Sequence, residues 1–311
     1  MAGNSIVSVG DGGRFTVSDL VKNPLFIPTK LKEMIENQFI AETLLRNAGK
    51  NEGGVVAYHE GDPTFTEDDV QALAEFGEIP VTTVRGGVPR TAHSILNSLA
   101  VRVTKQMIDK NQIDLVNKQI TALKNTFIRF NDRQAKALFE SAAVPTLPVP
   151  AAWDGPNGKP RTDLARAIEQ IATAAPTDAT ADEYYGFEPD TIVVHPGLLA
   201  TLMDNEQILK VYQGNVANES IAYTGAIPGE LMGLTVLKSR TFPIDKVLLL
   251  ERGTVGFYSD TRLLQFTPTY PEGNGPNGGP RETWRTDATH ERAVALDQPK
   301  AALWLTGLVT P

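Results

Sequence analysis

Apolar residues recur at helical spacing in two parts of the N-terminal half of the chain. The first part covers residues 29–49, where a threonine suited to cap a helix comes first and a glycine suited to end one comes last. Its apolar stripe, with residues four positions apart, consists of Leu31, Ile35 and Phe39. This spacing predicts an amphipathic helix. Residues 1–28 are rich in glycine and show no sustained period, so we expect an extended arm there.

The second helical part lies between Thr91 and Val144, which contains neither proline nor glycine. Its main stripe, at spacings of three and four, consists of Ile113, Val116, Ile120, Leu123, Phe127 and Phe130. A shorter stripe precedes it, at Ile95, Leu96, Leu99 and Val103. We predict one rod-like helix over about 94–130, a break near Asn131, and a separate helix over the sequence RQAKALFESAA.

Between these parts, residues 53–93 have the pattern of a long hairpin. GGVVAY and EIPVTTVRGGV are typical of strands, and a possible capping box predicts a short helix from Thr66 to Phe76. Acidic residues crowd the connection, whereas Arg85 and Arg90 lie on the return strand. A hairpin of this length with few large apolar residues buries little against itself, so we expect it to need a neighbour.

The C-terminal half alternates short strands with helices. Residues 163–174 are predicted to be helical, and the strand TIVVHP leads into a predicted helix, GLLATLMDNEQILKVY. Strands are predicted at GLTVLKS, KVLLLE, VGFYSD, LLQFTPTY, RETWRTDATHERAVAL and KAALWLTGL. The Gly- and Pro-rich sequence PEGNGPNGGP predicts a flexible tip. The pattern predicts an α+β fold.

Composition narrows the function. The net charge of the 311 residues is −8, which argues against a protein whose main role is to coat nucleic acid, since such proteins concentrate Lys and Arg. Cysteine is absent, which excludes disulfides, thiolate catalysis and Cys-ligated metals. No signal peptide is visible, and the apolar run KVLLLE is too short to span a bilayer. We expect a soluble protein made inside the cell.

Candidate chemistry is sparse. The histidines, at positions 59, 93, 195 and 290, form no metal-ligand pair, and no GxSxG elbow occurs. The sequence GPNGKPR lacks the end of a phosphate-binding loop, so it is interpreted as a turn. We therefore expect no catalytic, cofactor-binding or metal-binding residues, no cofactor, and no enzymatic activity.

The order of these parts resembles the Hong Kong 97-type fold of the major capsid proteins of tailed bacteriophages. The segments that carry the resemblance are PDTIVVHPGLLATLMD, GLTVLKSRTFP, KVLLLERGTVGFYSDTR and RAVALDQPKAALWLTG. The resemblance implies an N-arm with its helix over 1–50 and an E-loop over 51–93. It assigns 94–130 and 263–297 to a peripheral domain with a spine helix, and 131–262 and 298–311 to an axial domain.

The resemblance also implies a function. Copies of the chain would assemble through pentamers and hexamers into an icosahedral shell around double-stranded DNA, without sequence-specific binding or membrane contact. The expected partners are a portal protein, a decoration protein and, since the chain enters its arm almost at once, a separate scaffolding protein without major cleavage of this chain. Assembly would take place in the host cytoplasm and the product would be the virion capsid.

Two alternatives remain open at this stage. One is an encapsulin-like compartment of the same fold that encloses a cargo enzyme, although the long arm before residue 29 favours the virus. The other is an α/β enzyme or a ligand-binding module, for which the sequence offers no site. The residues expected to contact neighbouring subunits are Leu31, Ile35, Phe39, Asp62, Asp68, Asp69, Arg85, Arg90, Glu272, Arg281 and Arg285.

In one branch of the capsid family, an E-loop lysine attacks an asparagine of a neighbouring subunit and forms an isopeptide bond. That step needs an amine that can lose its proton, and arginine stays protonated. Residues 51–104 contain no lysine: Lys50 precedes the expected hairpin, and Lys105 falls in the predicted rod helix. We therefore expect a shell that is held without such bonds.

Overall fold

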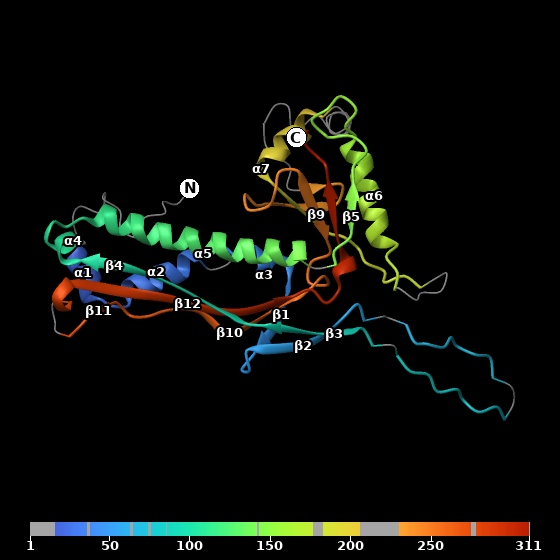
Figure 1. The fold of residues 1–311 in the computed structure, drawn as a ribbon, viewed down its shortest axis with the longest axis horizontal. Coiled ribbons are helices and arrows are strands. Elements are labelled where there is room, and N and C mark those ends of the chain that lie inside the picture. The colour runs from blue at the N-terminus through green and yellow to red at the C-terminus, as the bar shows by residue number, and fades with distance from the viewer. Residues whose placement is uncertain are drawn as a thin grey trace.

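The computed structural model describes residues 16–310 except 36–37, 63–64, 74–75, 85, 142, 177–182, 206–229 and 275–277. Within these residues the strands form a five-stranded, a six-stranded and a two-stranded sheet. The five-stranded sheet lies under one long helix, the six-stranded sheet forms a second body, and the two-stranded sheet opens into a loop that projects away from both (Figure 1). The predicted α+β fold is confirmed.

The five-stranded sheet is built around its longest strand, β12 (Thr283–Ala295). Along one edge β12 pairs antiparallel with β10 (Phe257–Phe266) and β11 (Tyr270–Pro271), and along the other with β4 (Ile95–Thr104). The remaining strand, β1 (Arg46–Lys50), adds to β10 in parallel. The segments VGFYSD and LLQFTPTY, predicted as two strands, therefore contribute mainly to one continuous strand, β10.

Helices cover one face of this sheet. The longest is α5 (Ile113–Ser141), and beside it lie α1 (Val17–Lys22), α2 (Phe26–Ile35) and α4 (Lys105–Asp109). The apolar stripe predicted for the rod helix faces this core, because spacings of three and four place its members on one side of α5. The buried core residues are Val17, Ile27, Leu31, Val103, Val116, Ile120, Leu123, Phe127 and Ala288.

Two predicted helices begin and end elsewhere. The predicted helix over 29–49 is two helices, α2 and α3 (Ile40–Leu44), because Phe39 has extended backbone before α3 begins. Thr29 lies inside α2 and caps nothing, and Gly49 lies in β1 with a φ of +85°.

The predicted rod helix over 94–130 is also wrong at both ends. Residues 95–104 form β4, because their backbone pairs with β12 over the whole strand. The predicted break near Asn131 does not occur: this side chain is buried and its amide donates to the Phe127 carbonyl oxygen at 3.0 Å. As a result α5 runs without interruption through RQAKALFESAA to Ser141, across the boundary expected after residue 130.

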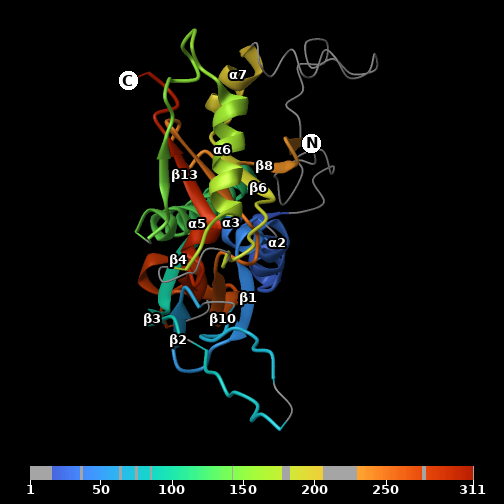
Figure 2. The same ribbon diagram turned by 90° about the vertical axis from the view of Figure 1, so that its right-hand side faces the viewer.

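The six-stranded sheet forms the second core. Its order is β5 (Thr146–Pro148), β13 (Ala302–Thr306), β9 (Lys246–Leu250), β6 (Thr191–Val194), β8 (Leu234–Lys238) and β7 (Glu230–Leu231). The inner strands are continuous apolar runs because both of their faces are buried. Helix α6 (Pro160–Ala172) stands along this sheet (Figure 2).

Several helices and strands predicted in the C-terminal half are present, some with different bounds. The helix predicted over 163–174 is α6, shifted by a few residues, and the strand TIVV is β6. It leads directly into α7 (Pro196–Asp204), which ends at its C-cap Asn205, and residues 206–212 of that predicted helix lie outside the described residues. Two short 3₁₀ helices, η1 (Gly279–Arg281) and η2 (Pro299–Ala301), flank β12.

A buried ion cluster joins the N-terminal helices to the sheet. Arg292 of β12 donates to both Asp260 carboxylate oxygens, at 2.6 and 2.9 Å, and to Glu42 of α3 at 2.7 Å. His290 lies 3.2 Å from Asp260, and the Arg292 guanidinium stacks 4.4 Å from the centre of the Tyr258 ring. Burial raises the pKa of Asp260, but hydrogen bonds with His290 and Arg292 outweigh it and lower that pKa to about 2.

We predict that Arg292→Gln lowers the free energy of unfolding by about 3–5 kcal/mol, because it leaves two carboxylates without their buried cation. Urea denaturation at neutral pH measures this difference. The control is Lys30→Gln, which removes an exposed ion pair with Glu33 of 2.7 Å and is expected to change stability by less than about 0.5 kcal/mol. Equal effects of the two substitutions would show that the cluster contributes no more than a surface pair.

Candidate assembly surfaces

The hairpin expected over 53–93 is present. Strands β2 (Val55–Glu60) and β3 (Val88–His93) pair antiparallel over their whole length, and the described residues between 61 and 87 continue beyond them, away from both bodies (Figures 1 and 2). We call residues 61–87 the projecting loop. Its two limbs are joined by few bonds, among them the Glu67 amide to the Thr83 carbonyl oxygen at 3.0 Å.

The short helix predicted from Thr66 to Phe76 is absent from the described residues of the projecting loop, which form bends, a turn and irregular backbone. The Thr66 hydroxyl donates to the Asp68 carbonyl oxygen at 2.9 Å and caps no helix. A helix of this length is marginal in water unless an apolar face packs against something. Among the described residues of the loop, Val70, Leu73 and Phe76 are at least half exposed, so they provide no packed apolar face, and the sequence signal for a helix start is not followed by a helix.

Apolar side chains of the projecting loop are open to solvent. The exposed fractions of Val70, Phe76 and Val81 are 97%, 99% and 92%. Ile79 and Val84 are also exposed. Several exposed apolar side chains on one segment favour an interaction site in a soluble protein. The loop therefore has the composition of a segment that is buried by something outside its own chain.

The root of the projecting loop is fastened to both bodies. The Gly61 amide donates to the Asp297 carbonyl oxygen at 2.7 Å, and the Gln298 side chain donates to the Asp62 carbonyl oxygen at 3.2 Å. From the second body, the Tyr185 hydroxyl donates to the Gly61 carbonyl oxygen at 3.3 Å. Contacts from several segments fix the direction in which the loop leaves the body.

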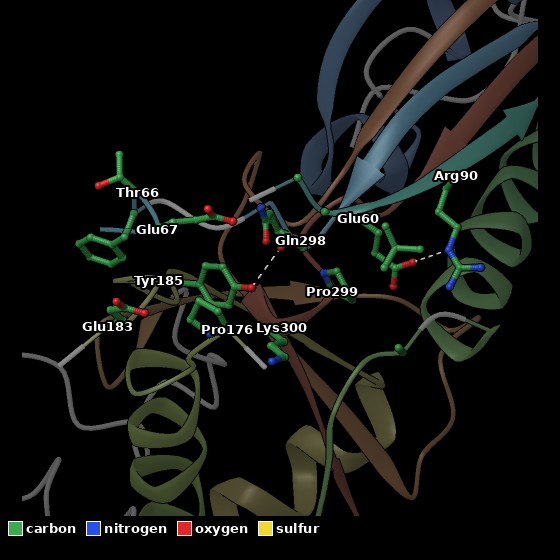
Figure 3. A pocket seen from close by; sticks show the side chains of 16 residues that line it. Glu60, Thr66, Glu67, Arg90, Pro176, Glu183, Tyr185, Gln298, Pro299 and Lys300 are labelled. Carbon is green, nitrogen blue, oxygen red and sulfur yellow. Dashed lines mark hydrogen bonds and ion pairs between the residues drawn. The ribbon is translucent and has the colours of Figure 1, made fainter. Parts of the chain in front are cut away.

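Around this root lies an open cavity of about 430 Å³ (Figure 3). Glu60 and Arg90 form an ion pair of 2.7 Å on one side of it. On the other side Tyr185 lies close to Lys300, whose ammonium group donates to the Ala175 carbonyl oxygen at 2.7 Å. Because Glu60, Arg90 and Lys300 already have partners, we interpret the cavity as the junction between the projecting loop and the second body and not as a binding site.

The far end of the five-stranded sheet holds a network of charges. Glu272 accepts from Arg102 at 2.6 Å and lies 3.7 Å from Arg285, which also pairs with Asp287. The hydrogen bond from Arg102 lowers the pKa of Glu272. Next to it Lys105 pairs with Glu282 at 3.0 Å. This network holds η1 and the strand ends in place at the tip that the sequence predicted.

The residues expected to contact neighbours fall into distinct places. Leu31, Ile35 and Phe39 are buried inside their own chain, so for them the expectation is corrected: they stabilise the subunit core and offer no surface. Those that lie at the loop, at its root or at the charged tip are Asp62, Asp68, Asp69, Arg90, Glu272, Arg281 and Arg285. Arg85 lies outside the described residues.

Sequence reasoning missed a further surface on β4. The strand has one edge that pairs with no strand in the described part of the chain, and its first half is exposed on both faces. A groove of about 410 Å³ runs between it and α5, and the exposed apolar residues along it are Leu96, Leu99 and Phe130. The same apolar residues of β4 had suggested a helix. An open edge with apolar flanks usually requires a cover.

Comparison with protein families gives the decisive observation. The sequence model of the phage capsid protein family matches residues 98–305, about two thirds of the chain. The chain belongs to the phage capsid protein family. Its role is structural, and copies of this capsid protein build a shell. A comparison with curated protein sequences found no match.

Solved structures agree on the fold of this capsid protein. A capsid structure of the cyanophage P-SCSP1u has 11% identity, covers 85% of this chain and 86% of its own, and superimposes with a TM-score of 0.58. The structure from Gordonia phage Cozz has 13% identity, covers 85% of this chain and 84% of its own, and superimposes with a TM-score of 0.56. A virus-like particle from Pyrococcus furiosus has 12% identity, covers 90% of this chain and 97% of its own, and superimposes with a TM-score of 0.55. At such low identities these similarities show the fold alone, which is of the Hong Kong 97 type.

Metal-binding clusters and membrane-spanning helices are absent from the described residues of the capsid protein. No set of three or more His, Cys, Asp or Glu side chains there is arranged to hold a metal ion. None of the helices described has the length and apolar character required to cross a membrane.

We predict that Gly87→Ala loosens the root of the projecting loop. A Cβ atom at Gly87 would clash with the Glu60 carbonyl oxygen and lie 2.8 Å from Asp62 Oδ1, which accepts from the Gly87 amide. Amide hydrogen exchange at residues 59–61 and at Val88 and Arg90 should become faster by roughly tenfold, with little change in global stability, because such openings are local.

The neighbouring Gly86 provides the control for this substitution, since an added Cβ atom there meets nothing within 4 Å. Gly86→Ala should leave the exchange rates unchanged. If both variants exchange at the wild-type rate, the close packing at Gly87 does not hold the root.

Proposed function

We propose that this capsid protein assembles through pentameric and hexameric rings into an icosahedral shell that encloses double-stranded phage DNA. The observation that carries the proposal is the family match over residues 98–305. The projecting loop supports it, because its apolar side chains are exposed on a segment that projects away from both bodies. In this proposal the five-stranded sheet with α5 is the peripheral domain, and the six-stranded sheet is the axial domain around which the rings close.

The projecting loop would lie across an adjacent subunit of the lattice. The β4 edge and its groove offer apolar surface on the receiving side, and the exposed valines and Phe76 offer it on the loop. Each such contact is small, but a closed shell repeats it at every subunit, so weak contacts add up to a stable particle. The ion pairs at the root and at the tip would contribute orientation more than affinity.

The partners and place of assembly follow from the same proposal. A separate scaffolding protein would guide assembly in the host cytoplasm, a portal protein would occupy one vertex, and a decoration protein would bind outside. The finished shell would be the capsid of the virion. In this role the chain acts as a structural protein without enzymatic activity and requires no cofactor.

The second candidate is a compartment that encloses a protein cargo. It is kept because a virus-like particle from Pyrococcus furiosus shares the fold at a TM-score of 0.55. The contents of purified particles separate the two. Particles from infected cells that hold DNA support the capsid, and particles that hold protein and no nucleic acid would replace it with the compartment.

We predict that the double substitution Val70→Asp and Val81→Asp blocks shell assembly and leaves the free subunit as stable as the wild type. Both side chains are almost fully exposed in the subunit, so their replacement affects its own folding by less than about 0.5 kcal/mol. Analytical ultracentrifugation of the variant should show free subunits or rings where the wild type forms shells.

The matched control is the double substitution Val70→Ile and Val81→Ile, which keeps the apolar surface and should still assemble. Shells formed equally well by the aspartate variant would show that the projecting loop stays in solvent after assembly.

We also predict that the shell contains no covalent links through the projecting loop. Residues 51–104 contain no lysine; Lys50 lies in β1 and Lys105 in α4, so neither is part of the loop. Mature particles boiled in denaturant should give one gel band near 33.7 kDa. A ladder at multiples of that mass would mean that a lysine elsewhere forms the bond.

A further inference from the structure

The outward face of α5, turned away from the sheet, carries a row of basic side chains. Lys118, Arg129 and Arg133 are exposed, and none of them forms an ion pair with any residue that the structure describes. Lys136, one turn further, pairs with Glu140 at 3.7 Å. We call the first three residues the α5 basic row.

Nearby acidic groups do not neutralise the α5 basic row. Asp132, the acidic residue nearest in sequence to Arg129 and Arg133, is half-buried and accepts from the Ile40 amide at 3.4 Å. Burial raises its pKa. Asp114, one turn before Lys118, lies beyond ion-pair distance. The row therefore has no ion-pair partner among the described residues.

This row stands out against the charge of the whole chain. The net charge is −8, and the projecting loop carries exposed acids such as Asp68 and Asp69. Other exposed basic groups differ in this respect: Arg102 pairs with Glu272, whereas Arg161 and Arg166 of α6 have no ion-pair partner among the described residues. Net charge alone predicts a subunit that repels DNA, whereas the α5 basic row gives the outward face of this helix a local positive charge that attracts it.

The spacing within the row suits a nucleic acid backbone better than a protein partner. Lys118 and Arg129 are separated by about 16 Å along the helix axis, and Arg129 and Arg133 by about 6 Å, at 1.5 Å per residue. Between them the exposed positions Ala122 and Asn125 are short and uncharged. Cores of protein interfaces are depleted of charge, whereas phosphate contacts are made by separated Lys and Arg side chains.

We propose that the outward face of α5 binds the phosphate backbone of the enclosed double-stranded DNA, without reading its sequence. The inference rests on the proposed function, because it requires the side of α5 that is turned away from the sheet to point into the interior of the shell. Three phosphate contacts per subunit bind weakly, but the shell repeats them at every copy. Such contacts are screened by salt and exchange readily, so DNA can still slide during filling.

The test compares the full-length protein with the triple variant Lys118→Gln, Arg129→Gln, Arg133→Gln. Fluorescence anisotropy of a labelled duplex of about 30 base pairs gives the affinity between about 50 and 200 mM salt, at concentrations where the protein is not yet closed into shells. We expect the variant to bind at least tenfold more weakly at the lowest salt. Its salt dependence should be less steep by about 2 to 3, because each phosphate contact contributes about 0.9.

The control variant is Lys159→Gln, Arg161→Gln, Arg166→Gln, which removes the same charge from exposed positions at the N-cap and in the first two turns of α6. It should bind like the wild type. No binding by the wild type, or equal affinity and salt slope for both triple variants, overturns the inference. If the α5 variant binds DNA normally but no longer co-assembles with a scaffolding protein, the row serves an acidic protein and the DNA assignment is wrong.

This experiment is independent of the test of the proposed function. Electron micrographs report whether wild-type shells form, and the anisotropy measurement reports only on the α5 face. Failure to form shells contradicts the capsid proposal, whereas failure of the salt slope to change contradicts the binding of DNA by α5 alone.

Discussion

The pairing of β12 along both of its edges is the constraint on which the rest of the subunit depends. Its ladder with β4 covers ten residue pairs, from Thr283 to Arg292, and its other edge holds β10 and β11. The buried Ala288 of β12 lies in the core that it shares with α5, and Arg292 of β12 pairs with Glu42 of α3. Beyond Ala295 the chain passes through η2 directly into β13, the second strand of the other sheet. One strand therefore carries the first sheet, its helices and the link to the second body.

Patterns that are local in sequence were enough for much of this fold. The three- and four-residue spacing from Val116 to Phe127 defined the buried side of α5, and the short apolar run Lys246–Leu250 defined β9. Such patterns survive because the period of burial follows directly from helix or strand geometry. The hairpin was also predictable, since β2 and β3 flank a segment too polar to bury itself.

Other features depend on partners far away in the chain. Ile95, Leu96 and Leu99 have a spacing that fits a helix, yet β4 is a strand because β12 offers a complementary edge more than 180 residues later. The β-branched residues Val101, Val103 and Thr104 were the available signal for a strand. The continuity of α5 at Asn131 has a similar origin, since burial and a bond to its own helix hold that residue in place. The residues of the α5 basic row are visible in the sequence. Only the structure shows that a nearby acidic side chain, Asp132, is bonded to the Ile40 amide and forms no ion pair with the row.

Helix α5 takes part in both cores, and this has a mechanical consequence. Its N-terminal half packs on the five-stranded sheet, whereas Ala135 and Phe139 belong to the core of the six-stranded sheet. At that end the Trp304 indole donates to the Phe139 carbonyl oxygen at 3.2 Å. A straight helix anchored at both ends acts as a strut, so the two bodies keep a fixed angle to each other. In the proposed icosahedral shell, differences in curvature between one lattice site and another would then be absorbed where packing is thinnest, in the limbs of the projecting loop. A single sequence could thus occupy non-identical positions without any rearrangement of its cores.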